Sequence, residues 1–152
     1  MVLSCNSAFA CTCVQVSHRD EFLEASAVFA GKVIEVREDT SYLPSKLNVS
    51  SAIQKIVDST KRYLVTLRIE QNFKGAAGKE VVLYAFQSDS SCMGLMFMQS
   101  EKYLIYAVRN QGRLSDGGLC SRTSKLDKTS KEYRELVRSF RTWSKQSRSQ
   151  NK

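Results

Sequence analysis

The sequence is poor in features that define several classes of protein. Its 152 residues include one proline, and 42% of them are hydrophobic against 25% charged. This balance excludes collagen, low-complexity disordered chains and miniproteins held together by disulfides alone. A chain of this length can bury roughly 70% of its unfolded surface. We therefore expect one globular domain with a hydrophobic core of its own.

Long hydrophobic runs and catalytic motifs are also missing. The longest runs, such as 81–86 and 103–108, are the length of a strand, whereas a membrane helix needs roughly 18 apolar residues. The sequence has no nucleophile elbow, no H-E-x-x-H motif and no P-loop. Its single histidine, His18, stands alone. We expect neither a membrane span, nor an enzyme, nor a cofactor of the chain's own.

The five cysteines form an odd number. Cys5 lies within residues 1–10, which end in the small-x-small sequence Ala8-Phe9-Ala10, the pattern that signal peptidase cleaves. We interpret residues 1–10 as the remnant of a signal peptide. A lipobox remnant at residues 2–5 and an ordinary N-terminal extension are the alternatives. Cleavage would make Cys11 the first residue of the mature chain.

The four remaining cysteines, Cys11, Cys13, Cys92 and Cys120, indicate an oxidising compartment and two disulfides. We therefore expect a secreted protein, or a periplasmic one in a bacterium. Four cysteines allow three pairings, and the residues alone do not select one. A zinc site of four cysteines is a weaker alternative, because Cys11-x-Cys13 is tighter than a zinc knuckle and the other two are far apart. A catalytic thiol is weaker still, since only His18 could activate it.

Positive charge gathers at the C-terminal end. The net charge is +8, and residues 125–152 contribute +6 of it, from nine Lys or Arg against three acids. Such a tail can attract a polyanion. It can equally be the solvated face of a helix that aids solubility.

Hydrophobic periodicity predicts a mainly β chain. Period-two alternation and short apolar runs predict strands at 28–36, 63–70, 81–86 and 103–108, with a weaker fifth at 113–120 that Gly117-Gly118 interrupts. Phe29, Gly31 and Val33 share one face of the first strand, and Gly31 predicts a bulge or a close backbone approach. Five closely spaced strands favour a closed OB-like barrel.

Helices are expected at both ends of the barrel sequence. A short helix at 20–27 follows the N-terminal segment that contains Cys11-x-Cys13, which we call the arm. A second short helix is expected around 52–57, in the long connection 39–60. Near the C-terminus five apolar side chains recur at helical spacing, namely Tyr133, Leu136, Val137, Phe140 and Trp143. Thr129 and Glu132 have the spacing of a capping box at the start of this helix. We expect the helix to pack on the barrel.

Several short motifs, in this order, resemble the inhibitory N-terminal domain of the tissue inhibitors of metalloproteinases. They are Cys11-Thr12-Cys13-Val14 at the predicted mature start, a helix, the strand 28–33, the turn Phe73-Lys74-Gly75, the loop Ser90-Ser91-Cys92 with Gly94, the strand 103–105, and Cys120. The resemblance covers residues 11 to about 124, with residues 125–152 forming a C-terminal helix and basic tail.

The resemblance implies an OB-like barrel of the netrin type, with disulfides joining Cys11 to Cys92 and Cys13 to Cys120. In this family the α-amine and carbonyl of the first cysteine chelate the catalytic zinc of a target metalloendopeptidase, at the position that such zinc keeps for water. By this resemblance Cys11 would be the zinc ligand, with Thr12 entering the specificity pocket. Cys13, Val14, Ser90, Ser91 and Cys92 would complete the protease-binding surface.

The chain departs from the family in three ways. It lacks a third disulfide and the second, cysteine-rich domain of animal members, and Met93 separates Cys92 from Gly94. With residues 1–10 attached, the nitrogen of Cys11 is an amide, so that form should not inhibit. The alternative function is a non-inhibitory netrin-like module that binds a protein or a polyanion through a basic surface.

Nucleic acid is not an expected partner. An OB barrel that binds single strands needs exposed stacking aromatics on a basic groove. Barrel packing accounts for Tyr63, Tyr84, Phe86 and Tyr103 equally well.

Overall fold

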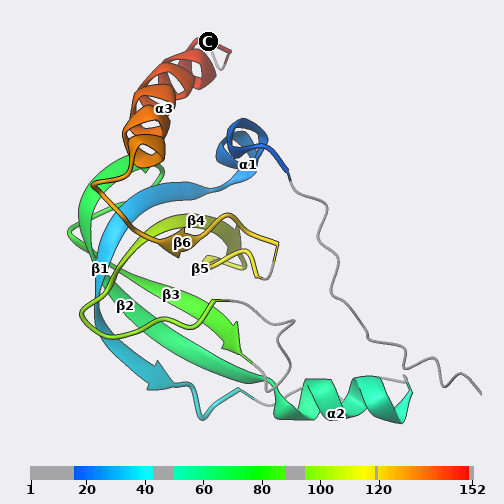
Figure 1. The fold of residues 1–152 in the computed structure, drawn as a ribbon. Helices are drawn as coiled ribbons and strands as arrows, with labels where there is room; N and C mark the ends of the chain where they lie inside the picture. Colours follow the sequence, from blue (N-terminus) through cyan, green and yellow to red (C-terminus); the bar gives the residue numbers. More distant parts are fainter. Residues whose placement is uncertain (1–15, 43–49, 88–94, 119, 151–152) are drawn as a thin grey trace, which may run out of the picture.

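The computed structural model describes residues 16–42, 50–87, 95–118 and 120–150. Six strands and three helices follow one another in these ranges (Figure 1). They are α1 (His18–Glu24), β1 (Ala27–Glu38), α2 (Ser51–Ser59), β2 (Lys61–Lys74), β3 (Glu80–Gln87), β4 (Lys102–Asn110), β5 (Arg113–Ser115), β6 (Ser124–Lys125) and α3 (Lys131–Gln150).

Strands β1 to β5 close into a barrel. The sheet runs in the order β1-β2-β3-β5-β4, and β4 pairs back with β1, which leaves the short β6 on the outer side of β4. All pairs are antiparallel except β3 with β5. This mixed barrel of five strands with a helix at each end of the chain confirms the expected OB-fold-like architecture.

The alternation in the sequence decides which side chains fill the barrel. Along β2, Val65 and Leu67 point inward and are fully buried, as are Leu83 and Ala85 on β3. Phe29 of β1 joins the same core. The structure thus confirms the four main strands at their predicted places. Strands β2 and β3 bury one face, as a period of two encodes, whereas β1 and β4 are buried on both faces over much of their length.

The predicted irregularity at Gly31 is present. The register between β1 and β2 shifts between Ala30 and Gly31. A Cβ at Gly31 would lie 3.1 Å from the carbonyl oxygen of Arg68, closer than most side chains approach a neighbouring strand. The glycine therefore lets β2 cross β1 closely where the barrel bends.

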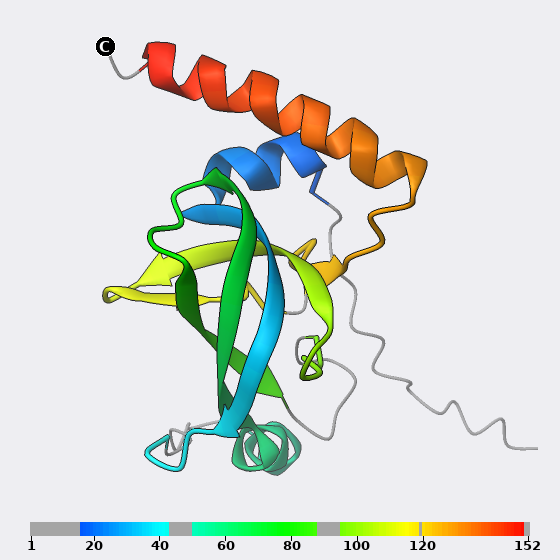
Figure 2. The ribbon, with the colours of Figure 1, turned by 90° about the vertical axis from the view of Figure 1, so that its left-hand side faces the viewer.

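A second core lies outside the barrel, under α1 and α3 (Figure 2). Phe140 of α3 is fully buried, with its ring centroid 5.0 Å from that of Phe22 on α1 and 4.8 Å from that of Phe73. Val28 and Tyr106 supply the barrel side of this cluster. The expected packing of the C-terminal helix on the barrel is confirmed.

The structure corrects the predicted capping box of α3. The Oγ of Ser130, not of Thr129, accepts a hydrogen bond from the backbone N–H of Tyr133, at 3.1 Å. Thr129 instead donates both its N–H and its hydroxyl to Asp127 Oδ1, at 2.9 and 2.6 Å. The Asp127 side chain competes for Thr129, so the helix begins one residue later than the motif suggested.

Other boundaries also differ from the sequence analysis. Helix α1 spans His18–Glu24, earlier than 20–27, because the Oγ of Ser17 accepts from Asp20 N and caps it. The fifth strand keeps only Arg113–Ser115, since the backbone turns to positive φ at Gly117 and Gly118. The helix expected near 52–57 is α2.

Within the described ranges, no helix combines the length and the apolar character needed to cross a bilayer.

Candidate functional site

The residues expected to contact a protease lie outside the described ranges. This holds for Cys11, Thr12, Cys13 and Val14, and for the loop residues Ser90, Ser91 and Cys92. The described chain resumes at Val16 after the first group and at Leu95 after the second. The structure therefore describes the chain next to these two groups, and we call the contacts that hold this chain in place the anchors of the site.

Cys120 is the one cysteine within the described ranges. It is exposed and disulfide-bonded. The other four cysteines lie outside those ranges, so its partner, and the expected Cys11–Cys92 pair, remain predictions.

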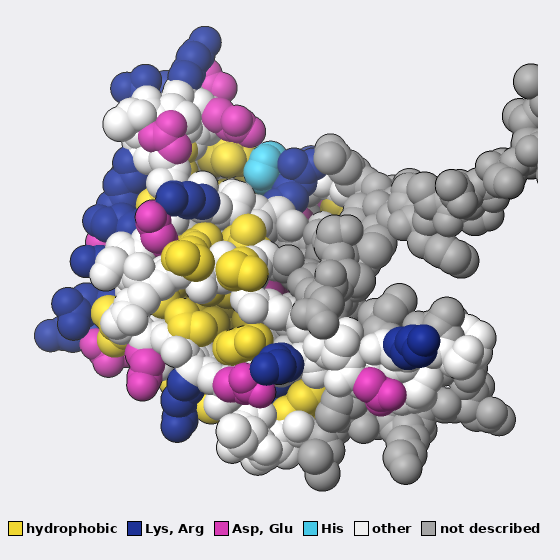
Figure 3. All heavy atoms as spheres, turned by 60° about the horizontal axis from the view of Figure 1, so that its bottom comes forward, with side chains coloured by type: hydrophobic (Ala, Val, Ile, Leu, Met, Phe, Trp, Pro, Cys, Tyr) yellow, Lys and Arg dark blue, Asp and Glu magenta, His cyan; other side chains and the backbone are white. Residues whose placement is uncertain are grey.

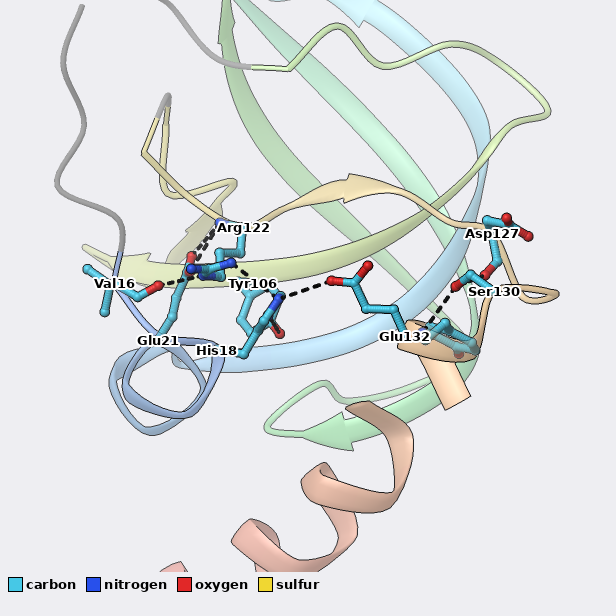
Figure 4. A network of polar contacts seen from close by, with 9 residues as sticks. Val16, His18, Glu21, Tyr106, Arg122, Asp127, Ser130 and Glu132 are labelled. Carbon is cyan, nitrogen blue, oxygen red and sulfur yellow. Dashed lines mark hydrogen bonds and ion pairs between the residues drawn. The ribbon is translucent and has the colours of Figure 1, made fainter. Parts of the chain in front are cut away.

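Arg122 ties the N-terminal arm to the segment that follows Cys120. Its Nε donates a hydrogen bond to the carbonyl oxygen of Val16, three residues after Cys13 (Figure 4). Its backbone N–H donates to both carboxylate oxygens of Glu21, at 2.8 and 3.0 Å. The Ser121 hydroxyl donates to the same carboxylate at 2.9 Å. These bonds hold the end of the arm and the 120–122 segment side by side.

His18 completes this polar cluster. Its Nε2 lies 3.2 Å from Arg122 Nη1, and its Nδ1 lies 2.9 Å from the Tyr106 hydroxyl. Because a guanidinium can only donate, Nε2 accepts and the proton sits on Nδ1. Burial, and then the positive charge of Arg122, lower the pKa of His18, while Glu132 at 4.0 Å opposes them. The ring is therefore held neutral.

The ring reaches the surface all the same. Figure 3 shows the cyan side chain of the single histidine beside a basic side chain, next to a group of hydrophobic side chains on the same face. Its side chain keeps 26% of its surface exposed. His18 is thus partly exposed on this face, while the polar contacts of its ring hold the start of α1 in place.

Tyr106 and Thr123 extend the cluster into the barrel wall. The Thr123 hydroxyl accepts from the backbone N–H of Tyr106 at 2.9 Å, and both residues are buried. Burial, with a smaller contribution from Glu21, raises the pKa of Tyr106 well above its usual value. The phenol is neutral and serves as a fixed hydrogen-bonding partner for His18, with no acid–base role at ordinary pH.

A second anchor fixes the chain where it returns from the 88–94 segment. Phe97 is buried in the barrel against Tyr103, with ring centroids 4.9 Å apart. The Tyr103 hydroxyl accepts from Met98 N at 2.9 Å and donates to the carbonyl oxygen of Met96 at 3.3 Å. Met96 and Met98 themselves remain 65% and 55% exposed. The barrel therefore displays two methionines from a fixed backbone directly after this segment.

Asp116 is a buried carboxyl near Cys120. It is 2% exposed, and its Oδ1 accepts from Gly118 N at 3.1 Å. Burial raises its pKa, an effect that this hydrogen bond partly offsets. Asp116 shapes the turn that leads from β5 toward Cys120 and has no ion-pair partner among the described side chains.

Sequence reasoning missed this polar cluster. Glu21 and Arg122 lie 101 residues apart, and no local pattern links them. The single histidine was the available signal, but its spacing to other residues predicts no site. In the described part of the chain, no three His, Cys, Asp or Glu side chains are grouped so as to hold a metal ion.

Neither the protein-family models nor the curated proteins contain a match to this chain. The resemblance to the metalloproteinase inhibitors therefore rests on the motifs and on the barrel.

Proposed function

We propose that this chain is the barrel domain of a secreted inhibitor of zinc metalloendopeptidases, active once Cys11 is its first residue. In this proposal the α-amine and carbonyl oxygen of Cys11 displace the water on the target's zinc. Thr12 fills the pocket beside the metal, and Ser90 and Ser91 form the other half of the contact. The zinc belongs to the protease, and the inhibitor supplies ligands held in the correct geometry.

The observation that carries the proposal is the attachment of the arm by Arg122. A chelating N-terminus must be rigid before binding, because ordering it on the protease would weaken the complex. The hydrogen bond from Arg122 to Val16 fixes the chain three residues after Cys13 and two residues after Cys120. A Cys13–Cys120 disulfide is thus within easy reach of two segments that already lie together.

The OB-like barrel gives further support. It closes β1 against β4 and fixes Phe97 and Tyr103 at the base of the second predicted contact segment. Both proposed halves of the protease-binding surface therefore start from backbone that the barrel holds in place.

The decisive experiment compares two forms of the protein against a panel of zinc endopeptidases. One begins at Cys11, and the other carries a single alanine before it. We expect only the first to inhibit, because the extra residue turns the amine into an amide. Equal inhibition by both forms, or none by either, would contradict chelation. Inhibition should also weaken below about pH 8, where protonation of the α-amine competes with zinc.

A polyanion-binding module is the second candidate, and α3 provides a specific reason to keep it. Arg134, Arg138, Arg141 and Lys145 recur along one exposed side of the helix, and no carboxylate in the described ranges forms an ion pair with them. Their spacing gives a stripe about 17 Å long, at roughly 1.5 Å per residue.

The test of the second candidate is salt-dependent retention on a polyanion column. Deleting residues 125–152 is unsuitable, because it removes the buried Phe140. Changing the four stripe residues to Gln leaves the buried face intact. Loss of retention in that variant would support the stripe, and unchanged retention would exclude it.

A further inference from the structure

The outer side of the barrel carries a second group of basic residues that the tail does not include. Side chains alternate along β2 and β3, and every second one points into the barrel core. The residues between them therefore lie on the outer side, namely Arg62, Leu64, Tyr84 and Phe86. Strand register places four outward residues in one row across β1, β2, β3 and β5, namely Arg37, Leu64, Tyr84 and Ser115. We call this surface the arginine face; its members are Arg37, Arg62, Arg109 and Arg113 with Tyr42, Tyr84 and Phe86.

Two depressions hollow the arginine face. The larger, of about 460 Å³, is lined in part by Arg37, Arg109 and Arg113, and the smaller, of about 150 Å³, by Arg62 and Phe86. Both include Tyr84 and Arg113, so they adjoin. The β4–β5 turn borders them and projects from the barrel in Figure 2. They form one shallow groove across the barrel wall.

The charge of this groove is largely uncompensated. Arg62 is paired with Asp39, and its Nε donates to that carboxylate at 2.8 Å. The Ser41 hydroxyl, followed by Arg62, lowers the pKa of Asp39. No carboxylate among the described residues forms an ion pair with Arg37, Arg109 or Arg113. Among the described residues, Asp39 is therefore the only carboxylate paired with any of these four guanidinium groups, and a polyanion is the complementary ligand.

The aromatic rings of the face are already occupied. The guanidinium carbon of Arg62 lies 4.9 Å from the ring centroid of Tyr42 and 5.0 Å from that of Tyr84. Arg113 lies over the same Tyr84 ring at 5.2 Å, and Phe86 packs edge-on to Tyr42. A nucleic acid base would need an open ring to stack on.

The guanidinium groups are the ligand-binding elements that remain. A guanidinium that lies on a ring is oriented by it, and its planar fork of N–H donors suits sulfate and carboxylate oxygens. The row from Arg37 to Ser115 crosses three strand spacings, about 14 Å at roughly 4.8 Å each. This length suits several anionic groups along one chain.

We propose that the arginine face binds an acidic polysaccharide, a sulfated or carboxylated sugar chain. The corresponding face of OB-like barrels, on the second and third strands beside the turn between the fourth and fifth, is suited to oligosaccharides as well as oligonucleotides. Here the covered rings favour anionic groups over bases. The site is separate from the Cys11 end of the chain and does not depend on protease inhibition.

The test measures binding of size-defined heparin oligosaccharides to the full chain by calorimetry at physiological salt. The variant Arg37→Gln/Arg109→Gln/Arg113→Gln removes three exposed side chains. We expect it to bind at least about tenfold more weakly, because charge-assisted hydrogen bonds are lost. Circular dichroism and the midpoint of urea unfolding check that the variant keeps its fold.

The matched control is Arg19→Gln/Lys55→Gln/Lys131→Gln, which removes the same number of charges from exposed side chains outside both the arginine face and the stripe on α3. It should bind heparin within about twofold of the unmodified chain, because net charge alone contributes little at physiological salt. Equal weakening by both variants, or weakening by the control alone, would overturn the proposal. So would failure of the unmodified chain to bind heparin, or tighter binding to a single-stranded DNA oligonucleotide at the same salt. Metalloprotease inhibition by the form beginning at Cys11 should not change in the arginine-face variant.

Discussion

At the scale of single residues, the fold opposes the ionisation of His18. Its folded pKa lies below the unfolded value of about 6.5, chiefly because of burial and Arg122. The unfolded chain therefore takes up this proton first as pH falls. The contribution of neutral His18 to stability is complete above pH 6.5 and is lost as pH drops toward the folded pKa.

Replacing His18 with Gln should flatten this part of the stability profile. We expect the unmodified chain to lose more free energy of unfolding between pH 7.5 and pH 5 than the variant loses. Urea unfolding at the two pH values measures the difference. An identical loss in both proteins would show that His18 does not carry the effect.

Glu132 gives an independent check on the same ring. Its carboxylate raises the pKa of His18, against the other influences. Glu132→Gln should therefore lower that pKa further, and NMR can follow it directly because the chain has one histidine. A rise in the pKa of His18, or no change, would contradict the assigned contact. Glu135→Gln, one helical turn away and paired with Lys131, is the matched control.

At the scale of elements, the start of α3 distinguishes two capping schemes. Ser130→Ala should cost about 1 kcal/mol of stability, the usual effect of losing an N-cap side chain. Thr129→Ala should cost less, because Thr129 bonds to Asp127 in the preceding turn. Thermal unfolding of the two variants ranks them. A larger loss of stability in Thr129→Ala than in Ser130→Ala would instead support the capping box formed by Thr129 and Glu132.

This capping error shows what the sequence could predict about the elements. Alternation separated the two faces of β2, because burial on one side of a strand leaves a pattern of period two. The same logic placed Phe140 and Trp143 on the inner face of α3. Which of two adjacent hydroxyls caps a helix depends on competition from Asp127, and periodicity contains no such information.

A turn beside the barrel provides a second prediction at this scale. Gly75 has φ of 65°, and a Cβ there would lie 2.0 Å from the carbonyl oxygen of Ser26. Gly75→Ala should therefore destabilise the chain by more than about 2 kcal/mol, since the strained backbone and the clash add together. Gly112 has φ of 78° but open space around it.

Gly112→Ala is thus the control for the clash at Gly75. It carries the backbone strain alone, and we expect a cost of about 1 kcal/mol. Denaturant unfolding of both variants separates the two contributions. Equal losses would mean that the contact with Ser26 relaxes without cost.

At the scale of the whole molecule, the sequence predicted the barrel better than its surfaces. Arg37, Arg62 and Arg113 lie on three different strands, and only the register between those strands brings them to one side of the barrel. Arg109 of β4 joins them at the depression that it lines with Arg37 and Arg113. The sequence leaves open whether Tyr84 packs in the barrel or is exposed for stacking, and the structure puts its ring on the outer side between arginines. Long-range pairing decides such surfaces, and local patterns do not record it.

The association of α3 with the barrel decides whether the chain unfolds as one unit. Trp143 is the only tryptophan, and its ring lies 5.6 Å from that of Phe140 and 5.5 Å from that of Phe22. Its fluorescence therefore reports contact between α3, α1 and the barrel. Far-ultraviolet circular dichroism reports the helices and strands together.

We expect the two signals to change at the same urea concentration, because the second core shares Val28 and Tyr106 with the barrel wall. Phe140→Ala should lower the free energy of unfolding by about 3 to 5 kcal/mol, the usual cost of removing a buried aromatic ring. Both signals should then move together to a lower urea concentration. The exposed neighbour Arg138→Ala should change neither midpoint appreciably. If tryptophan fluorescence instead changes first and Phe140→Ala moves that transition alone, α3 docks independently of the barrel. The C-terminal charges would then be carried on a detachable helix, whereas a single transition makes them part of the barrel's own fixed surface.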